Sequence, residues 1–164
     1  MTAQDYENWT RMLRRHPGQL RALLLCNKLL TGLIYVSYPA LLLVLLVTQP
    51  MALPRVVLTP AISFILLSLF RDRVNLPRPY EALDIQPLIH KTTKGHSFPS
   101  RHVFSVTVIA CAFLYLMPWI GIVFLFFAVL MSVIRVLGGV HFPRDVVVGF
   151  ALGLLSGWIG FVLL

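Results

Sequence analysis

Long apolar runs alternate with short polar segments along most of the chain. Four of these runs are apolar enough to cross a lipid bilayer, and a fifth extends to the last residue. The five predicted spans cover residues 29–47, 56–70, 103–116, 120–137 and 146–164. A helix needs roughly 20 apolar residues to cross the hydrocarbon core, so we expect the short second and third spans to extend into flanking residues. The pattern predicts an all-α, integral-membrane helical bundle of about five transmembrane helices.

The N-terminal segment has a different pattern, in which apolar and polar side chains occupy opposite faces of one helix. Tyr6, Trp9, Met12 and Leu13 recur at helical spacing opposite Glu7, Asn8 and Arg11. This pattern predicts an amphipathic helix in the membrane interface, which His16-Pro17-Gly18 would end; a frayed basic tail is the alternative. The segment lacks the apolar core of a cleavable signal peptide. We therefore divide the chain into residues 1–26, the interfacial helix with its basic lead-in, and residues 27–164, the membrane-embedded domain.

The composition supports a membrane protein and limits its partners. Hydrophobic residues make up 58% of the sequence, and the mean hydropathy is +0.83. The formal net charge is +8, but the cations cluster beside the predicted spans, which fits lipid phosphates better than nucleic acid. Cys26 and Cys111 fall at or within the spans, so they predict neither a disulfide nor a metal framework.

The polar segments between spans meet on one side of the membrane when the chain crosses back and forth. The second span ends at Arg71 and the third begins near His102. The fourth span ends at Arg135, shortly before the fifth begins. Loop 71–101 is the longest connection and is expected to carry the active site. Alternation alone gathers the following residues on this side: Arg71, Arg78, Ser100, Arg101, His102, Arg135, His141 and Asp145.

The arginines of this group have few carboxylates to neutralise them. A guanidinium presents a planar fork of donors that matches phosphate oxygens, and it stays charged at any physiological pH. Ser100 stands where a helix is expected to begin, so it is a natural N-cap. The unpaired N–H groups at such a helix start also attract anions. A single arginine at a span end would more often extend to the interface, but several arginines beside two histidines favour an anion site.

His141 and Asp145 flank the start of the last span, and Asp145 is the only acidic residue after Asp84. Pro143 suits the first helical turn. From that turn the Asp145 carboxylate could reach back to His141 and fix the tautomer of the imidazole. Ionisable groups at a membrane border are costly and usually functional, although a packed or interfacial histidine is the alternative. We interpret His141 as a nucleophile or base, with His102 as the acid that protonates a leaving oxygen.

Three short motifs occur in order between residues 71 and 145. The first is Arg71, six residues and then Arg78-Pro79. The second is Pro99-Ser100-Arg101-His102, and the third is Arg135, five residues, His141, three residues and Asp145. Together they resemble the motifs of the type 2 phosphatidic acid phosphatases, lipid phosphate phosphatases related to the vanadium-dependent haloperoxidases. The family usually has Lys at the position of Arg71, Gly at Arg101 and Ser at Ile134.

The resemblance implies roles for these residues. His141 would be the nucleophile, Asp145 the carboxylate that orients it and His102 the general acid. Phosphate would be bound by Arg71, Arg78, Ser100 and Arg135, together with the backbone near Arg101. We count the Arg101 side chain as a further cationic contact, although it could point away. The Arg71 guanidinium is a planar fork of donors and is larger than the compact ammonium of a lysine, so its contact with phosphate must differ in geometry.

The expected activity is hydrolysis of a lipid phosphate or diphosphate through a phosphohistidine. Phosphatidic acid, phosphatidylglycerol phosphate and a polyprenyl diphosphate are the substrates considered, in a membrane and without nucleic acid. No cofactor or metal is expected; a metal site on His90, His96 and His102 is an alternative with few carboxylates to support it. Two other functions stay open: a non-catalytic lipid-phosphate binding or transport protein, and a phosphotransferase that uses the same phosphohistidine. The sequence does not predict an oligomeric state.

Two signals disagree about the membrane face that holds the site. Cations that precede the first span favour the cytoplasmic face by the positive-inside tendency. These cations are Arg11, Arg14, Arg15, Arg21 and Lys28. The family resemblance instead implies the extracytoplasmic face, where its members commonly act.

Overall fold

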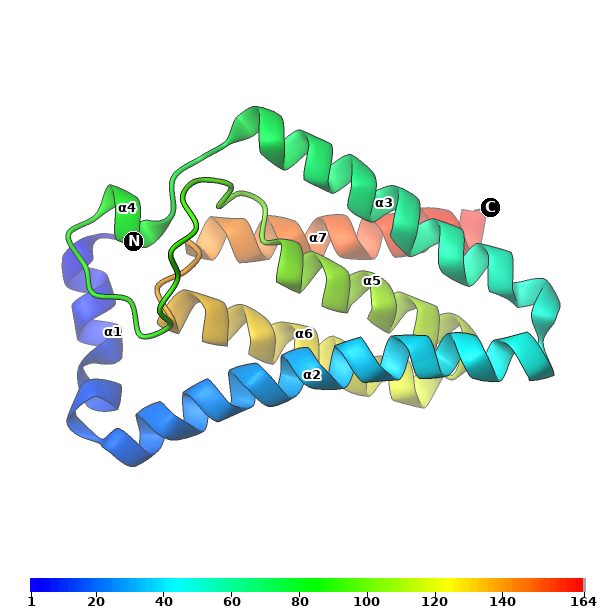
Figure 1. Ribbon diagram of the computed structural model, residues 1–164, viewed down its shortest axis with the longest axis horizontal. Helices are drawn as coiled ribbons and strands as arrows, with labels where there is room; N and C mark the ends of the chain where they lie inside the picture. The colour runs from blue at the N-terminus through cyan, green and yellow to red at the C-terminus, as the bar shows by residue number, and fades with distance from the viewer. Residues whose placement is uncertain (164) are drawn as a thin grey trace.

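Five long helices lie side by side in the computed structural model, which describes residues 1–163 (Figure 1). They are α2 (Pro17–Thr48), α3 (Leu53–Val74), α5 (Arg101–Leu116), α6 (Pro118–Leu137) and α7 (Pro143–Trp158), the last continued by the π-helical turn η2 (Ile159–Leu163). The other elements are α1 (Ala3–Arg15), the short α4 (Pro79–Ala82) and the 3-10 turn η1 (Pro50–Ala52). Residues 1–163 contain no strand. The predicted all-α class is confirmed.

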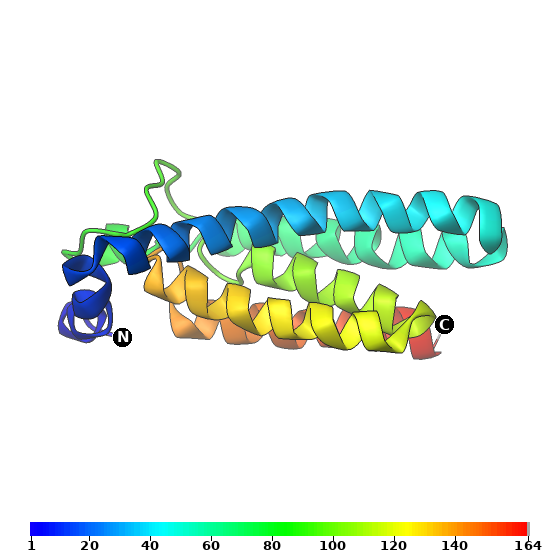
Figure 2. The ribbon, with the colours of Figure 1, turned by 90° about the horizontal axis from the view of Figure 1, so that it is seen from below.

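Helix α5 lies at the centre of the bundle. It packs most extensively on α6 and α7 and also contacts α3 and α2. In Figure 2, α2 and α3 form one layer, and α6 and α7 lie on the other side of α5. Most of the α5 side chains between Val103 and Phe113 are buried, whereas α2 and α3 expose many large apolar side chains, such as Val47 and Leu66.

The bundle has the dimensions of a multi-pass membrane protein. Four helical segments are long and apolar enough to cross a bilayer: α2, α3 with its flanking turns, α6, and α7 with η2. Their exposed apolar side chains suit contact with lipid. This agrees with the predicted membrane-spanning architecture.

Helix α5 is shorter than the other apolar helices. The predicted extension of the short spans is correct for α3, which has 22 residues, but α5 adds only Arg101 and His102 to its predicted span and has 16. A helix of that length is about 24 Å long, below the roughly 30 Å thickness of the hydrocarbon core. The loop that precedes α5 therefore lies at the end of the bundle (Figure 1), and its polar residues Ser97 and Ser100 are buried there.

The N-terminal helix ends where the sequence predicted, but the first span begins much earlier than expected. Thr2 caps α1: its Oγ1 accepts a hydrogen bond from the Asp5 N–H at 3.1 Å, and its own N–H donates to Asp5 Oδ2 at 2.7 Å. His16 separates the two helices, and Pro17 already occupies the first turn of α2. Proline needs no N–H acceptor there and has a helical φ. The basic lead-in after Pro17 is thus part of α2.

Helix α1 lies across one end of the bundle (Figure 1). Its Tyr6 is fully buried. The Tyr6 hydroxyl donates to the Leu137 carbonyl at 3.1 Å and accepts from the Leu88 N–H at 3.2 Å. Arg14 donates to the Gln86 carbonyl at 2.5 Å. These bonds connect α1 to the loop before α5 and to the end of α6.

Glycines let α7 approach α5 closely. A Cβ atom added at Gly153 would lie 2.6 Å from Thr107 Cβ, and one at Gly157 would lie 2.3 Å from Cys111 Cβ. At the start of α7, a Cβ at Gly149 would lie 2.7 Å from the Ser100 carbonyl oxygen. Small residues at four-residue intervals are a common means of close helix contact in membranes. This contact fixes the first turn of α7 against the start of α5.

Candidate active site

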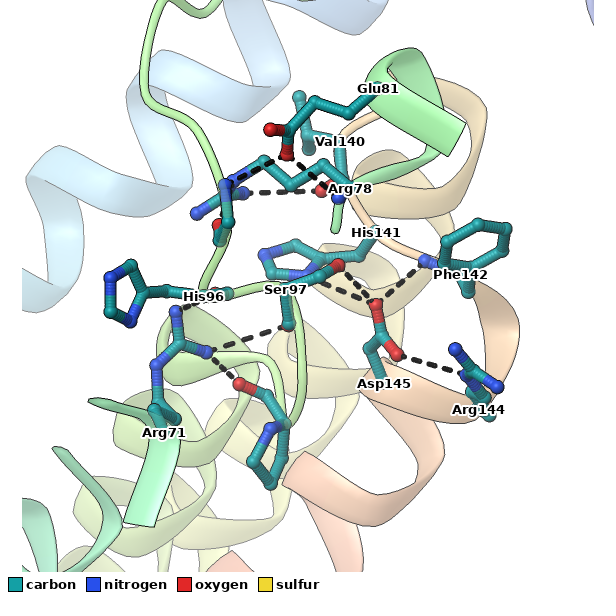
Figure 3. Close-up of polar contacts among 12 residues, drawn as sticks. Arg71, Arg78, Glu81, His96, Ser97, Val140, His141, Phe142, Arg144 and Asp145 are labelled. Carbon is teal, nitrogen blue, oxygen red and sulfur yellow. Dashed lines mark hydrogen bonds and ion pairs between the residues drawn. The ribbon is translucent and has the colours of Figure 1, made fainter. Parts of the chain in front are cut away.

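Three segments that are distant in the sequence meet at the end of the bundle near α1. They are the end of α3, the loop of residues 83–100 with the first turn of α5, and the connection from α6 to α7. Figure 3 shows how their polar side chains converge. A backbone hydrogen bond from the Ser100 N–H to the Asp145 carbonyl, 2.8 Å long, joins the start of α5 to the start of α7.

The centre of the site is a buried imidazole beside a buried carboxylate. His141 is 2% exposed and Asp145 is 0% exposed, and 3.6 Å separates His141 Nδ1 from Asp145 Oδ2. The same oxygen accepts hydrogen bonds from Ser97 Oγ at 2.5 Å and from the Phe142 N–H at 3.0 Å. Because Nδ1 faces the carboxylate, Nε2 on the opposite ring edge is the nitrogen available to a ligand.

Burial keeps the His141 imidazole neutral. Its pKa falls to about 4, chiefly because burial disfavours the charged ring, while Asp145 opposes this shift and the Arg78 charge adds to it. A histidine normally titrates near pH 6.5. The ring therefore has an unprotonated nitrogen at neutral pH, as a nucleophile requires.

Arg71 and Arg78 are both buried and hold the loop before α5 in place. The Arg71 guanidinium donates to the carbonyls of His96, Ser97 and Pro99. Arg78 donates to the Gly95 carbonyl at 3.0 Å and to the Val140 carbonyl at 3.2 Å. Each guanidinium has five donors. Both arginines thus use part of their donors on the loop backbone and retain others.

Two buried polar groups at the site have neither a hydrogen-bond partner nor an ion-pair partner within residues 1–163. Arg135 is 3% exposed and its Nε makes no hydrogen bond. Ser100 occupies the N-cap position of α5, but its side chain does not make the expected capping bond, and its buried Oγ is unpaired. Buried polar groups are normally satisfied. These two groups therefore mark a place where an anionic ligand would find donors.

The first turn of α5 places the remaining predicted residues at the edge of the site. His102 is partly buried, and the cations Arg135 and Lys91 lie close enough to act on it electrostatically. Arg101 is exposed, and its guanidinium lies over the Phe64 ring, 5.6 Å from the ring centroid. Arg101 thus lies against α3, at the same end of the bundle as Arg71 and Lys91.

Two residues of the site were not found from the sequence. Ser97 binds Asp145 across 48 positions, and no local pattern indicates such a contact. Lys91 lies within reach of the arginine charges; the only indication of this in the sequence was its place in the long polar loop.

The alternative metal site would need its histidines to lie together with other metal-binding side chains. His96 contacts Asp72, with 3.2 Å between Nδ1 and Oδ1. Within residues 1–163, no three His, Cys, Asp or Glu side chains form a group that could hold a metal ion.

The helical membrane bundle thus combines a buried histidine–carboxylate pair with unpaired arginine and serine donors, an arrangement suited to an oxyanion. The chain belongs to the PAP2 superfamily, because the model of that family matches residues 52–164. This range contains all three motifs. The predicted family is therefore confirmed.

Curated relatives match this part of the chain. The undecaprenyl-diphosphatase of Sulfolobus acidocaldarius is 36% identical over 86 residues, which are 52% of this chain and 40% of the relative. The lipid A 1-phosphatase of Rhizobium etli is 32% identical over 104 residues, which are 61% of this chain and 44% of the relative. The chain thus spans less than half the length of these relatives.

Solved structures share the whole fold. The crystal structure of LpxE from Aquifex aeolicus superposes with a TM-score of 0.76 at 26% identity, and the match covers 97% of this chain and 93% of that one. A transmembrane PAP2 type phosphatidylglycerolphosphate phosphatase from Bacillus subtilis gives a TM-score of 0.69 at 24% identity, covering 96% of this chain and 83% of that one. At this identity the second likeness concerns the fold alone.

Proposed function

We propose that this protein is a membrane-embedded phosphatase that hydrolyses a lipid phosphate or diphosphate. The observation that carries the proposal is the buried His141–Asp145 pair beside the unpaired donors of Arg135 and Ser100. Family membership and relatives named as phosphatases support it. The apolar bundle gives a lipid substrate direct access from the membrane.

In the proposed reaction, His141 Nε2 attacks the phosphorus atom, and the bond to the leaving oxygen breaks with its electron pair. His102 donates a proton to that oxygen. Arg135, the remaining donors of Arg71 and Arg78, and the first N–H groups of α5 stabilise the charge on the phosphoryl oxygens. Water then attacks the phosphohistidine, with His102 as base, and inorganic phosphate leaves. Asp145 holds the imidazole and stabilises its positive charge.

The direct test is phosphate release by the purified protein in detergent. Phosphatidic acid, phosphatidylglycerol phosphate and a polyprenyl diphosphate are supplied separately with EDTA present. We expect turnover of at least one lipid and its loss in His141→Ala. Activity retained in that variant would overturn the mechanism. Lipid binding without turnover would favour a binding or transport protein, and phosphate appearing on an added acceptor would favour a phosphotransferase.

We also propose that the site faces away from the cytoplasm, as the family resemblance implies; the N-terminal cations favour the opposite face. Lys94 is exposed in the loop before α5 and offers a place for labelling. A Lys94→Cys variant without Cys26 and Cys111 should react with a membrane-impermeant maleimide in intact cells. Reaction only after permeabilisation would place the site on the cytoplasmic face.

A further inference from the structure

The candidate site has more cations than its nearby carboxylates neutralise. Asp145 binds Ser97 and Phe142, Asp72 contacts His96, and Glu81 accepts from the N–H groups of Arg78 and Gly95. Arg71 and Arg78 are anchored on backbone carbonyls. Arg144 pairs with Asp145, and within residues 1–163 three further cations of the site make no hydrogen bond or ion pair: Arg135, Lys91 and Arg101. A phosphate monoester carries only about two negative charges.

Lys91 is placed to meet an anion. It is partly buried in the loop before α5. The pKa of its ammonium falls to about 8, chiefly because of burial, and the charges of Arg135, Arg78 and Arg101 contribute to this fall. A lysine held among like charges is unfavourable without an anionic ligand. An anion between Lys91 and these arginines would remove that repulsion.

Arg101 and His102 both line an apolar cavity. The cavity has a volume of about 380 Å³ and is lined by Arg101 and His102 at the start of α5, by Tyr35 and Tyr38 on α2 and by Phe64 on α3. A second cavity of about 320 Å³ shares Tyr38 and Phe64 and continues along α3. If a lipid chain occupied these cavities and its terminal phosphate lay at His141, the group that joins the chain to that phosphate would lie beside Arg101.

We propose that Arg101 and Lys91 bind the second phosphate of a lipid diphosphate, so that the protein cleaves lipid diphosphates in preference to monophosphates. This inference rests on the proposed function. His141 Nε2 would bond to the terminal phosphorus while the bond from that phosphorus to the bridging oxygen breaks. The lipid monophosphate leaves with the electron pair, and water then releases inorganic phosphate from His141.

The chemistry of the leaving group agrees with this placement. A lipid alkoxide is a strong base and needs a proton as it leaves, whereas a phosphate leaving group is a far weaker base. Fixed cations can stabilise the charge that develops on it. A second phosphate bound by Arg101 and Lys91 would carry this charge on its own oxygens, whereas a monophosphate has no such group for them to bind.

The test uses farnesyl diphosphate and farnesyl monophosphate, which share one chain and differ by one phosphate. Purified wild-type protein should show kcat/KM about tenfold or more higher for the diphosphate. Arg101→Gln and Lys91→Gln should each lower the diphosphate value about 10- to 100-fold, the range for a lost charge-assisted hydrogen bond, and change the monophosphate value by less than about threefold. Lys94→Gln, in the same loop but exposed, is the matched control.

Each result decides the proposal. Equal losses on both substrates, or no preference in the wild type, would overturn it and leave the phosphatase function intact. No turnover of either lipid by the wild type would instead count against the proposed function. Thermal unfolding is measured for every variant, and Arg101→Lys should recover part of the diphosphate activity if charge, rather than folding, is what Arg101→Gln removes.

Discussion

At the scale of single residues, Asp145 shares one carboxylate oxygen, Oδ2, among three neighbours. Ser97 and the Phe142 N–H donate to it, and His141 Nδ1 lies 3.6 Å away. Asp145 also lies 3.6 Å from the Arg144 side chain through its other oxygen. The position of the imidazole therefore depends on groups from two different loops (Figure 3).

Ser97→Ala removes the side-chain donor that fixes this carboxylate. A hydrogen bond to a charged group contributes roughly 1.5–3 kcal/mol, so we expect kcat to fall about 10- to 100-fold while KM changes little. Ser68→Ala is the control, because Ser68 is only partly buried and its hydroxyl bonds only to the Phe64 carbonyl of its own helix. An unchanged kcat in Ser97→Ala, or an equal fall in the control, would contradict this role.

The depressed pKa of His141 predicts how the ring titrates. The folded protein should protonate it near pH 4, whereas an unfolded chain does so near pH 6.5. Between these values the unfolded state binds more protons, so stability should fall as the pH falls from about 6.5 to about 4. NMR of protein labelled at histidine, with His141→Ala to assign the signal, measures the midpoint. A midpoint at or above pH 6.5 would show that burial does not control this ring.

At the scale of helices, hydropathy predicted the spans better than their ends. The sequence placed the first span at residues 29–47, but α2 begins at Pro17. Arg21 and Lys28 lie within that helix, and charged side chains lower hydropathy without interrupting helical hydrogen bonds. The spacing of His141 and Asp145 was informative because side chains four positions apart at the start of a helix lie close together. No such rule connects Ser97 to Asp145, since loop 83–100 is shaped by bonds from Arg71 and Arg78.

The contact between α5 and α7 depends on small residues. In Gly153→Ala the new methyl group would lie 2.6 Å from Thr107 Cβ, so the helices must separate. We expect the free energy of unfolding to fall by about 1–3 kcal/mol and kcat to fall with it, because this contact positions Asp145. Gly32→Ala on α2 is the matched control, since a Cβ there has no neighbour within 4 Å. Equal effects of the two variants on thermal unfolding in detergent would contradict the close contact.

At the scale of the whole molecule, the short length of the central helix α5 explains where the cations cluster. Because α5 is short, polar loop 83–100 lies at one end of an otherwise apolar bundle, and Arg71, Arg78 and Arg135 surround it. Alternation across the membrane predicted which segments meet there. It could not predict which arginines are anchored on carbonyls and which stay unpaired, because that depends on the path of the loop.

A phosphohistidine at His141 is detected most directly by a rapid-quench single turnover with a lipid substrate labelled with ³²P on its terminal phosphate. After an alkaline quench, which preserves phosphohistidine, the protein is digested and the labelled peptide is identified. The label should appear on His141 and decay as inorganic phosphate forms, and His141→Ala should show neither. Release of phosphate with no label on His141 at any time, or with label on another residue, would show that His141 is not the nucleophile.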